Sequence, residues 1–409
     1  MTAPAGSLQA PTALMADLDL GDEAFVADPY PTLARLRAQG PIVAHPGSGL
    51  LLATTHAAVS ETLRHRHLGR IWRDREPAQT HEPFNLLHRH QMMENEPPAH
   101  TRLRRLVSAA FARGHVERMR PRVQRIADGL LDRLDAGDVV DLVASYAEPL
   151  PVAVIADLLG VPAEDGPLLR GWSQAMVRMY EYERTAEVEA AAVRASTDFT
   201  AYVRDLVAER RSKPGADLLT DLVQATEDGA WLSEDELVAS TVLLLNAGHE
   251  ASVNAFGNGL VDLLTHPAEL ARVVSGDIAA STAVEEMLRH DAPLQLFERT
   301  ATADVELVGV SVSAGAKVAA LLGAANRDPA VFYDPDRFDL GRDPNPHVGF
   351  GMGVHFCLGA PLARVELAVT LERLLARWPR LALAGAPVRR PTFVLRGYRQ
   401  VPVDLGRAA

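Results

Sequence analysis

The sequence has few or none of the features that mark several common protein classes. Of its 409 residues only one is a cysteine, which excludes a disulfide scaffold and a multi-cysteine metal site. Aromatic residues make up only 5% of the chain, and lysine occurs only at Lys213 and Lys317. No apolar run approaches the roughly 20 residues of a membrane-spanning helix, and no basic and then apolar segment opens the chain. We therefore expect a soluble, cytoplasmic protein that makes no use of a membrane.

The charge balance is acidic. The chain carries 53 acidic and 41 basic residues, which gives a formal net charge of −12. Phosphate backbones are bound through basic surfaces, so nucleic acid is not expected as a partner. Hydrophobic residues make up 47% of the chain, which is typical of a globular protein with a large core. Because no linker, low-complexity tract or repeat divides it, we expect a single domain over residues 1–409, and a monomer.

Helical periodicity dominates from about Pro98 to Pro293. Ser233 and Glu236 form a capping box, which marks the start of the longest predicted helix. Nothing interrupts this helix before Pro267, so it is expected to run for about 33 residues, or roughly 50 Å. A helix this long and apolar belongs in the middle of the molecule.

Three other stretches complete the predicted outline of the fold. The run 50–54 reads as a strand, and the segment 305–318 is extended. The polar stretch 72–96, interrupted by histidine, proline and arginine, has no period and predicts a long loop. Together these features predict a mainly α protein with a small β-rich part, an α+β fold.

The segment 347–360, HVGFGMGVHFCLGA, places the cysteine between closely spaced glycines and a strong helix. The glycines at 349, 351 and 353 permit positive φ angles and let the backbone approach a flat ligand. Cys357 lies at the start of the following helix, where free amides and the helix dipole favour a thiolate. A lone cysteine is usually inert and buried. Here the glycines, Phe350 and His355 favour a ligand for haem iron instead.

The pattern Phe350-Gly351-x-Gly353-x-His355-x-Cys357-x-Gly359 resembles the haem-binding loop of the cytochrome P450 family at every characteristic position. Further motifs extend the resemblance, to soluble bacterial members, over about Pro29 to Leu405. It implies the cytochrome P450-like fold, with the long central helix over the haem. It also implies haem b (iron protoporphyrin IX) as the cofactor and Cys357 as the metal ligand.

The resemblance also implies a set of haem contacts. The segment 97–105 is similar to the helix that crosses the haem edge, and His100 and Arg104 are i, i+4 on it. Buried propionates need donors. The contacts implied by the resemblance are His100, Arg104, Arg299 and His355 for the propionates, and Phe350, Gly351, Gly359, Ala247 and Gly248 around the ring.

A second implied group is structural. Glu286 and Arg289 resemble the ExxR motif of the family and share one helix face. Residues 335–338 resemble the segment whose arginine, here Arg337, closes a buried triad with that motif. The triad Glu286, Arg289 and Arg337 is expected to hold the coil that precedes the haem loop.

Residues 247–252, AGHEAS, resemble the AGx(D/E)T segment above the oxygen-binding face. The chain departs from the family here, because Ala251 stands where a proton-delivering threonine is usual. We expect Glu250, Ala251 and Ser252 to bear on catalysis. Three alternatives remain open: a substrate hydroxyl or water relayed by Glu250, Ser252 acting through a helix distortion, or a reaction such as coupling or desaturation that depends less on this relay.

The neighbouring Asn246 is unusual for so apolar a helix. Its side chain could point at the substrate or bond a carbonyl of a neighbouring helix. We favour the second interpretation.

The resemblance implies a haem-thiolate monooxygenase that uses O₂ and electrons from NAD(P)H, through ferredoxin reductase and ferredoxin. From His100 to Arg125 there are eight arginines and one acid, which favours a docking face for an acidic, ferredoxin-like donor. The expected substrate is a hydrophobic small molecule, such as a natural-product intermediate. The implied pocket residues are Phe84, Leu244, Leu294, Phe297, Val394 and Leu395.

Two rival functions are weighed against this one. A haem sensor or electron-transfer protein would have no open distal pocket, which the segment at Ala247, Gly248 and Glu250 argues against. A peroxide-driven enzyme would be supported by a carboxylate-binding arginine in the distal helix, and the sequence of that helix has none.

Overall fold

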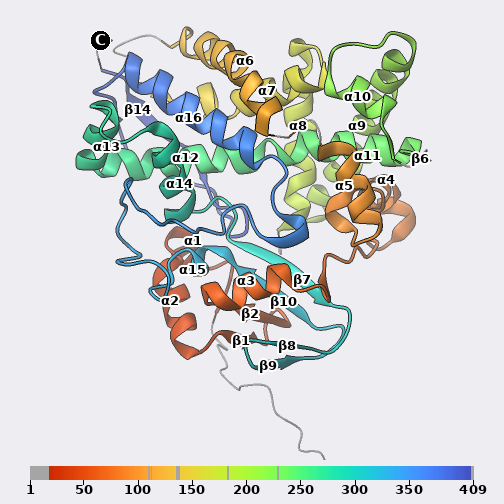
Figure 1. Cartoon of the computed structure of the whole chain (residues 1–409), viewed down its shortest axis with the longest axis horizontal. Coiled ribbons are helices and arrows are strands. Elements are labelled where there is room, and N and C mark those ends of the chain that lie inside the picture. The colour runs from red at the N-terminus through yellow and green to blue at the C-terminus, as the bar shows by residue number, and fades with distance from the viewer. Residues whose placement is uncertain are drawn as a thin grey trace, which may run out of the picture.

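The computed structural model describes residues 18–108, 111, 113–134, 139–181, 184–227 and 230–406. Helices α1 to α8 are Glu23–Ala27, Tyr30–Gln39, His56–Arg64, Ala78–Arg89, Ala99–Ser108, Arg113–Leu131, Pro149–Leu159 and Gly166–Val177. Helices α9 to α16 are Ala186–Ser212, Leu218–Gln224, Glu234–Ala247, Glu250–Thr265, Pro267–Val274, Ala280–His290, Leu322–Ala325 and Ala360–Arg377. Figure 1 shows α11 and α12 crossing the molecule one after the other, above the largest sheet.

The strands are short and belong to several sheets. Strands β1 to β7 are Ile42–His45, Leu50–Ala53, Leu68–Gly69, Val139–Asp141, Thr226–Glu227, Ala230–Trp231 and Leu296–Ala301. Strands β8 to β14 are Val305–Leu307, Val310–Val312, Lys317–Leu321, Ala382–Leu383, Val388–Arg389, Tyr398–Gln400 and Pro402–Asp404. The largest sheet has the order β1-β2-β10-β7-β3, in which β10 is parallel to β2 and antiparallel to β7. The predicted class, mainly α with a small β part, is confirmed, and 50–54 forms β2 as expected.

The predicted central helix is broken into two. The capping box is present, since Ser233 Oγ accepts from the Glu236 amide at 3.2 Å and the Glu236 carboxylate accepts from the Ser233 amide at 2.9 Å. The prediction of one helix to Pro267 is wrong, because α11 ends at Ala247 and α12 begins at Glu250. At the break the His249 amide bonds to the carbonyl of Asn246, three residues back, at 3.4 Å. Gly248 has low helix propensity, which favours the interruption at this point.

The predicted loop over 72–96 is also wrong in part. Residues Ala78–Arg89 form α4, with Pro83 inside it, and a 3₁₀ turn follows at Met92–Glu94. The buried face of α4 consists largely of His81, Phe84 and His88, which are spaced as a helix requires. Since two of these are histidines, hydrophobic periodicity alone does not reveal the helix.

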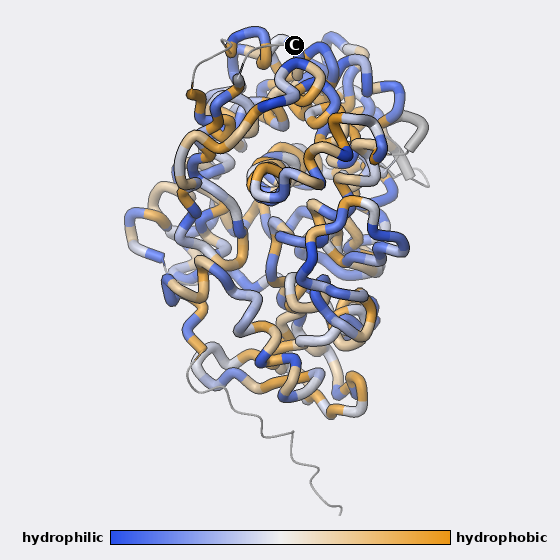
Figure 2. Tube along the Cα trace, turned by 90° about the vertical axis from the view of Figure 1, so that its left-hand side faces the viewer, coloured by the Kyte–Doolittle hydropathy of each residue, from blue (hydrophilic) through white to orange (hydrophobic). Residues whose placement is uncertain are grey.

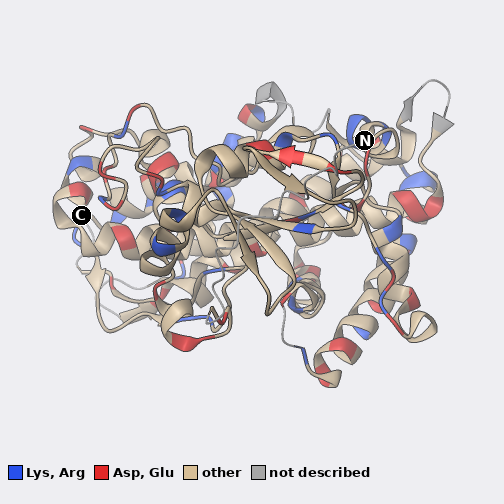
Figure 3. Ribbon diagram, turned by 90° about the horizontal axis from the view of Figure 1, so that it is seen from below, with Lys and Arg blue, Asp and Glu red and all other residues tan. Residues whose placement is uncertain are grey.

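The main hydrophobic core lies around α11, α12, α14 and α16. A separate hydrophobic cluster packs against the large sheet. Figure 2 shows hydrophobic positions recurring along the coloured part of the trace. Figure 3 shows charges of both signs spread over the helices. Among the described residues, no helix combines the length and the hydrophobicity that crossing a lipid bilayer requires.

Candidate functional site

The cysteine loop has the tight backbone that its glycines predict. Gly351 and Gly353 have φ angles of +68° and +72°, in the left-handed region. A Cβ on Gly353 would lie 2.5 Å from the Leu63 carbonyl oxygen, so this position also needs glycine for close packing against α3. The Cys357 amide donates to the Phe350 carbonyl at 2.9 Å, which closes the loop. The loop therefore presents Cys357 just before α16 begins at Ala360.

Several groups act on the Cys357 thiol. Its side chain is accessible, yet the surrounding protein desolvates the sulfur, and this burial raises the pKa of the thiol. The backbone amides of Gly359 and Ala360 and the positive charge of Arg104 oppose that rise in pKa. These groups would also stabilise a thiolate that is bound to a metal cation. Arg104 donates to the Phe356 carbonyl at 2.7 Å, which ties α5 to this loop.

A buried basic cluster lies beside the loop. The rings of His100 and His355 are 4.5 Å apart between centroids, and His355 contacts the Glu96 carboxylate at 2.7 Å. Both ring nitrogens of His100 and the Nε of Arg299 are buried without a hydrogen-bond partner. Burial lowers the pKa of His100 to about 4 and that of Arg299 to about 9.

These orphaned donors fit the cofactor that the sequence implies. Buried polar atoms are normally paired, so the unpaired nitrogens of His100 and Arg299 leave places for a hydrogen-bonding partner beside the loop. Haem b carries two propionates, and His100, Arg299 and His355 are chemically suited to bind them. Cys357 supplies the thiolate that a haem iron requires. The described residues thus fit haem b, and the assignment of single residues to its propionates remains a proposal.

A cavity of about 430 Å³ lies under α11 and α12. Ala247, Glu250 and Ala251 line it from the break between these helices. Of the predicted pocket residues, Leu294, Phe297, Val394 and Leu395 also line it, and their contact with a substrate stays a prediction. Leu294 and Leu395 are joined by an isolated β-bridge, which holds this wall together.

The other two predicted pocket residues, Phe84 and Leu244, lie in the hydrophobic core and are absent from the cavity wall. Phe84 is buried against His88, with ring centroids 4.1 Å apart. Leu244 lies on the part of α11 that packs away from the cavity. Phe84 and Leu244 therefore do not line this cavity, on whose wall α4 presents Leu87 and His88, and their contact with a substrate stays a prediction.

Not all residues of the segment 247–252, at the break between α11 and α12, line the cavity. Gly248 does not line the cavity, and a Cβ there would meet the Leu244 carbonyl oxygen at 3.2 Å and Ile155 of α7 at 3.7 Å. Ser252 is half-buried and is likewise absent from the cavity wall. Gly248 therefore packs toward α7 rather than onto the cavity wall, and its contact with the haem ring stays a prediction.

Glu250 is the carboxyl group of this segment that faces the cavity. Its burial, and the nearby charge of Glu148, raise the pKa of Glu250, whereas Arg390 lowers it. The Glu250 carboxylate lies 3.9 Å from Nδ1 of His249, whose ring nitrogens have no hydrogen-bond partner. Burial also lowers the pKa of His249 to about 4, so this ring is neutral at pH 7.

Asn246 lines the cavity, which the favoured interpretation of this residue did not predict. Its Nδ2 lies 3.5 Å from the sulfur of Met176 on α8, rather than on a helix carbonyl. Its Oδ1 is buried without a partner and so can accept a hydrogen bond from a ligand. A polar side chain in an otherwise apolar helix was the available signal.

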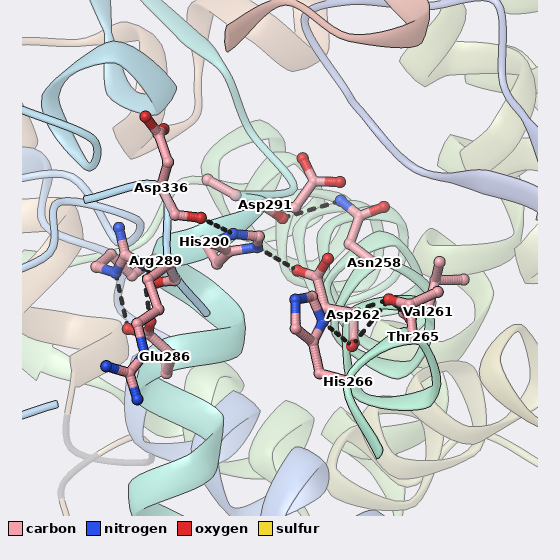
Figure 4. A network of polar contacts seen from close by, with 12 residues as sticks. Asn258, Val261, Asp262, Thr265, His266, Glu286, Arg289, His290, Asp291 and Asp336 are labelled. Carbon is pink, nitrogen blue, oxygen red and sulfur yellow. Dashed lines mark hydrogen bonds and ion pairs between the residues drawn. The ribbon is translucent and has the colours of Figure 1, made fainter. Parts of the chain in front are cut away.

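The predicted structural triad is corrected at one position. Arg289 contacts both oxygens of Glu286, at 2.7 and 2.8 Å, and Figure 4 shows the two side chains facing each other on α14. The side chain of Arg337 is exposed, and only its carbonyl takes part, accepting from Arg289 at 3.0 Å. Arg342 is the second arginine at Glu286, with its Nε 3.3 Å from the carboxylate. The turn at Arg337 directs its side chain outward and brings Arg342 back to the carboxylate.

Comparisons with known proteins find similar sequences and structures. The sequence profile named Cytochrome P450 matches residues 280–383. The chain is 40% identical to cytochrome P450 monooxygenase PikC of Streptomyces venezuelae over 97% of this chain and 96% of the relative. It is 40% identical to vitamin D(3) 25-hydroxylase of Pseudonocardia autotrophica over 95% of this chain and 96% of the relative.

A solved structure matches as well. The crystal structure of P450BioI, in complex with an acyl carrier protein ligated to hexadec-9Z-enoic acid, superposes with a TM-score of 0.89. It is 32% identical and covers 93% of this chain and 98% of that chain. With the cysteine loop, the buried basic cluster and the cavity, these likenesses show that the chain belongs to the cytochrome P450 family, the haem b-containing monooxygenases.

Proposed function

We propose that this monooxygenase hydroxylates, or otherwise oxidises at C–H bonds, a hydrophobic small molecule such as a natural-product intermediate. The observation that carries the proposal is the cavity, whose wall includes the aliphatic side chains of Leu294, Val394 and Leu395 and which opens onto Ala247, Glu250 and Ala251 at the helix break. Haem, when bound, supplies the activation of O₂ and the transfer of an oxygen atom. The relative named vitamin D(3) 25-hydroxylase supports hydroxylation of an apolar compound.

The residues of the chain divide the remaining tasks. Cys357, in its glycine-rich loop, would hold the iron, and His100, Arg299 and His355 would bind the propionates. Leu294, Phe297, Val394 and Leu395 would exclude water and orient the apolar part of the substrate. Glu250, with a raised pKa, would hold a proton at its carboxyl oxygen beside the reacting region.

A route from solvent to Glu250 can be described residue by residue. The Glu148 carboxylate lies 3.1 Å from Arg170 and 3.3 Å from Arg390, and all three side chains are partly exposed. The charges of Glu148 and Arg390 also shift the pKa of Glu250, which Glu148 raises and Arg390 lowers. We infer that protons reach Glu250 from this ion-pair group, which would compensate for the missing hydroxyl at Ala251.

The electron donor is proposed to be a ferredoxin-like protein, supplied by NAD(P)H through a reductase. Val354 and Phe356 of the cysteine loop are exposed apolar side chains, and Arg104 lies beside them. Several arginines of this region are engaged within the chain: Arg120 contacts Glu372 at 2.6 Å and Arg122 contacts Asp157 at 3.5 Å. This leaves a mixed apolar and basic face, so the rate of reduction would fall as salt rises.

The proposal is tested with the haem-loaded enzyme. Vitamin D(3) and myristic acid serve as first probes for a shift of the ferric Soret band from low to high spin. A probe that shifts the band is then incubated with NADPH, ferredoxin reductase and ferredoxin, and separately with peroxide alone. We expect an oxygen-containing product in the first incubation. Spin-shifting compounds that never yield one would overturn the proposal, and product with peroxide alone would remove the need for a ferredoxin.

One observation favours a second candidate reaction. Ala251 cannot donate a proton, and Ser252 does not line the cavity, so neither residue of this segment supplies a hydroxyl there. A coupling or desaturation reaction would depend less on such a hydroxyl. Product masses distinguish the two candidates, because hydroxylation adds one oxygen atom whereas desaturation removes two hydrogens. A cytoplasmic, monomeric, single-domain enzyme remains part of the proposal.

A further inference from the structure

The cavity wall carries more basic than acidic side chains. Arg70 contacts Glu94 at 2.5 Å, and Lys317 contacts Glu298 at 3.0 Å. Burial raises the pKa of Glu250, which disfavours its charged form relative to an exposed glutamate.

Two cations of this wall remain after these pairings, Arg73 and Arg75. Arg73 is exposed and can be neutralised by solvent and salt, whereas Arg75 is half-buried. Arg75 is therefore the cation of the cavity wall for which a partner matters most.

The surroundings of Arg75 contain further positive charge. Its Nη2 makes one long hydrogen bond, 3.4 Å to the Met179 carbonyl, which also accepts from Arg184 at 3.4 Å. Burial and the charge of Arg184 lower the pKa of Arg75, whereas the more distant charges of Glu189, Tyr180 and Glu298 raise it.

Among the described residues, the carboxylates of Glu189 and Glu298 act on Arg75 only from beyond ion-pair distance. The ion pair recorded for these two guanidinium groups joins Arg184 to the Glu189 carboxylate, at 3.8 Å. The Nε of Arg184 is buried without a hydrogen-bond partner. Two neighbouring guanidinium groups that share a carbonyl are well suited to an additional anion.

We propose that Arg75, supported by Arg184, binds a carboxylate of the substrate, so that the preferred substrate is an amphipathic acid. This inference rests on the proposed function and names its substrate class. A carboxylate can accept two parallel hydrogen bonds from a guanidinium group, which a neutral ester cannot match. A substrate ammonium group would be repelled by Arg73 and Arg75. The apolar remainder would extend along the aliphatic wall toward Ala247 and Ala251, which line the same cavity.

The test compares myristic acid with its methyl ester, which has the same chain and no charge. Dissociation constants are measured on the haem-loaded enzyme, by the Soret shift and by calorimetry, for the unaltered chain and for Arg75→Gln, Arg75→Lys and Arg73→Gln. We expect the unaltered chain to bind the acid at least about tenfold more tightly than the ester. Arg75→Gln abolishes this preference, Arg75→Lys keeps part of it, and Arg73→Gln, the matched exposed control, leaves it in place.

Equal binding of acid and ester, binding of neither, or a preference that survives Arg75→Gln would each overturn the inference. A preference abolished equally by Arg73→Gln would overturn it too, because a diffuse field would then replace a specific contact. The carbon monoxide spectrum of each variant is recorded alongside. Loss of its thiolate signature would count against the proposed function, whereas altered probe affinity with an intact signature bears on this inference alone.

Discussion

At position 251 an alanine leaves the cavity without the hydroxyl that usually delivers protons, and Glu250 is the acid next to it. Ser252 does not line the cavity, and the proposed function therefore assigns proton delivery to Glu250, with water or a substrate hydroxyl. Burial of Glu250 raises its pKa, so the group keeps a proton to higher pH than an exposed glutamate does. In the proposed function, this is the proton that Glu250 would donate to the reacting region.

The substitution Glu250→Gln therefore lowers the product formed per NADPH consumed, by about tenfold or more, because an amide cannot donate and recover a proton. In the unaltered enzyme this ratio falls as pH rises through the raised pKa of Glu250. Coupling is measured as product against NADPH oxidised, with substrate affinity as the control for a merely structural effect. Restoring the hydroxyl with Ala251→Thr raises coupling. If both substitutions leave coupling unchanged, a proton relay through Glu250 is not operating.

At the residue scale, the sequence predicts best those residues whose chemistry requires neighbours at fixed spacing. Cys357 and its glycines are of this kind, since a loop that holds a thiolate is built from consecutive residues. Arg75 and Asn246 are not, because their importance depends on what lies across the cavity from them. No local pattern distinguishes Arg75 from the exposed Arg73 two positions before it.

At the scale of secondary-structure elements and the coils between them, the motif in segment 335–345 predicts the right segment but the wrong arginine, because Arg342 and not Arg337 contacts Glu286. The motif correctly locates a coil that packs on α14, where Glu286 accepts from the Asp339 amide at 2.9 Å and from Asn345 at 3.2 Å. Which arginine turns inward depends on the path of the coil. That path places Arg342 against Glu286 and leaves Arg337 in solvent.

We expect Arg342→Gln to destabilise the folded protein by about 2–4 kcal/mol, since it removes one of two cations from a buried carboxylate. Arg337→Gln, the matched control, changes stability by less than about 0.5 kcal/mol, because its side chain is exposed. Urea unfolding of the haem-loaded proteins measures both. Equal losses for the two variants, or a larger loss for Arg337→Gln, would show that the exposed arginine and not Arg342 supports the motif.

Two other elements depart from their predictions for different physical reasons. The helix α4 is missed because histidines occupy its buried face, where His88 stacks between Trp72 and Phe84 at 4.4 and 4.1 Å. The break between α11 and α12 is missed because a glycine only weakens a helix, and tertiary packing decides whether it ends. The start of α11 is predicted correctly, because Ser233 and Glu236 form a capping box that can be recognised in the sequence.

At the scale of the whole molecule, Glu366 is a buried carboxyl group to which the proposed chemistry assigns no role. It lies on α16 in the core, and burial raises its pKa to about 8. An unfolded chain releases this proton near the ordinary value of 4.5, whereas the folded protein keeps it. The contribution of Glu366 to the stability of the folded protein is therefore fully present below the unfolded pKa, and it is lost progressively as pH rises toward 8.

The substitution Glu366→Gln removes the carboxyl group that loses its proton on unfolding. The variant therefore lacks the loss of stability that this group causes as pH rises. We expect the variant to gain stability relative to the unaltered chain by up to about 1.4 kcal/mol for each pH unit between about 5 and 8. The free energy of unfolding in urea is measured for both proteins at several pH values in this interval. A difference between them that does not change with pH would mean that Glu366 is ionised in the folded state.

The overall architecture is the part of the account that the sequence predicts most completely. The helical middle, the small sheets and the cysteine loop follow from periodicity, turn residues and a resemblance that spans nearly the whole chain. The size and charge of the cavity do not follow, because side chains from α4, α8, α11 and the C-terminal segment meet there only after folding.

The most direct test of the account is the absorption spectrum of the haem-loaded, reduced protein under carbon monoxide. Coordination of the iron by the Cys357 thiolate predicts a strongly red-shifted Soret band, which is lost in Cys357→Ser. A band at the position typical of histidine-ligated haem proteins, or an unchanged spectrum in Cys357→Ser, would contradict the central claim that this cysteine binds the iron.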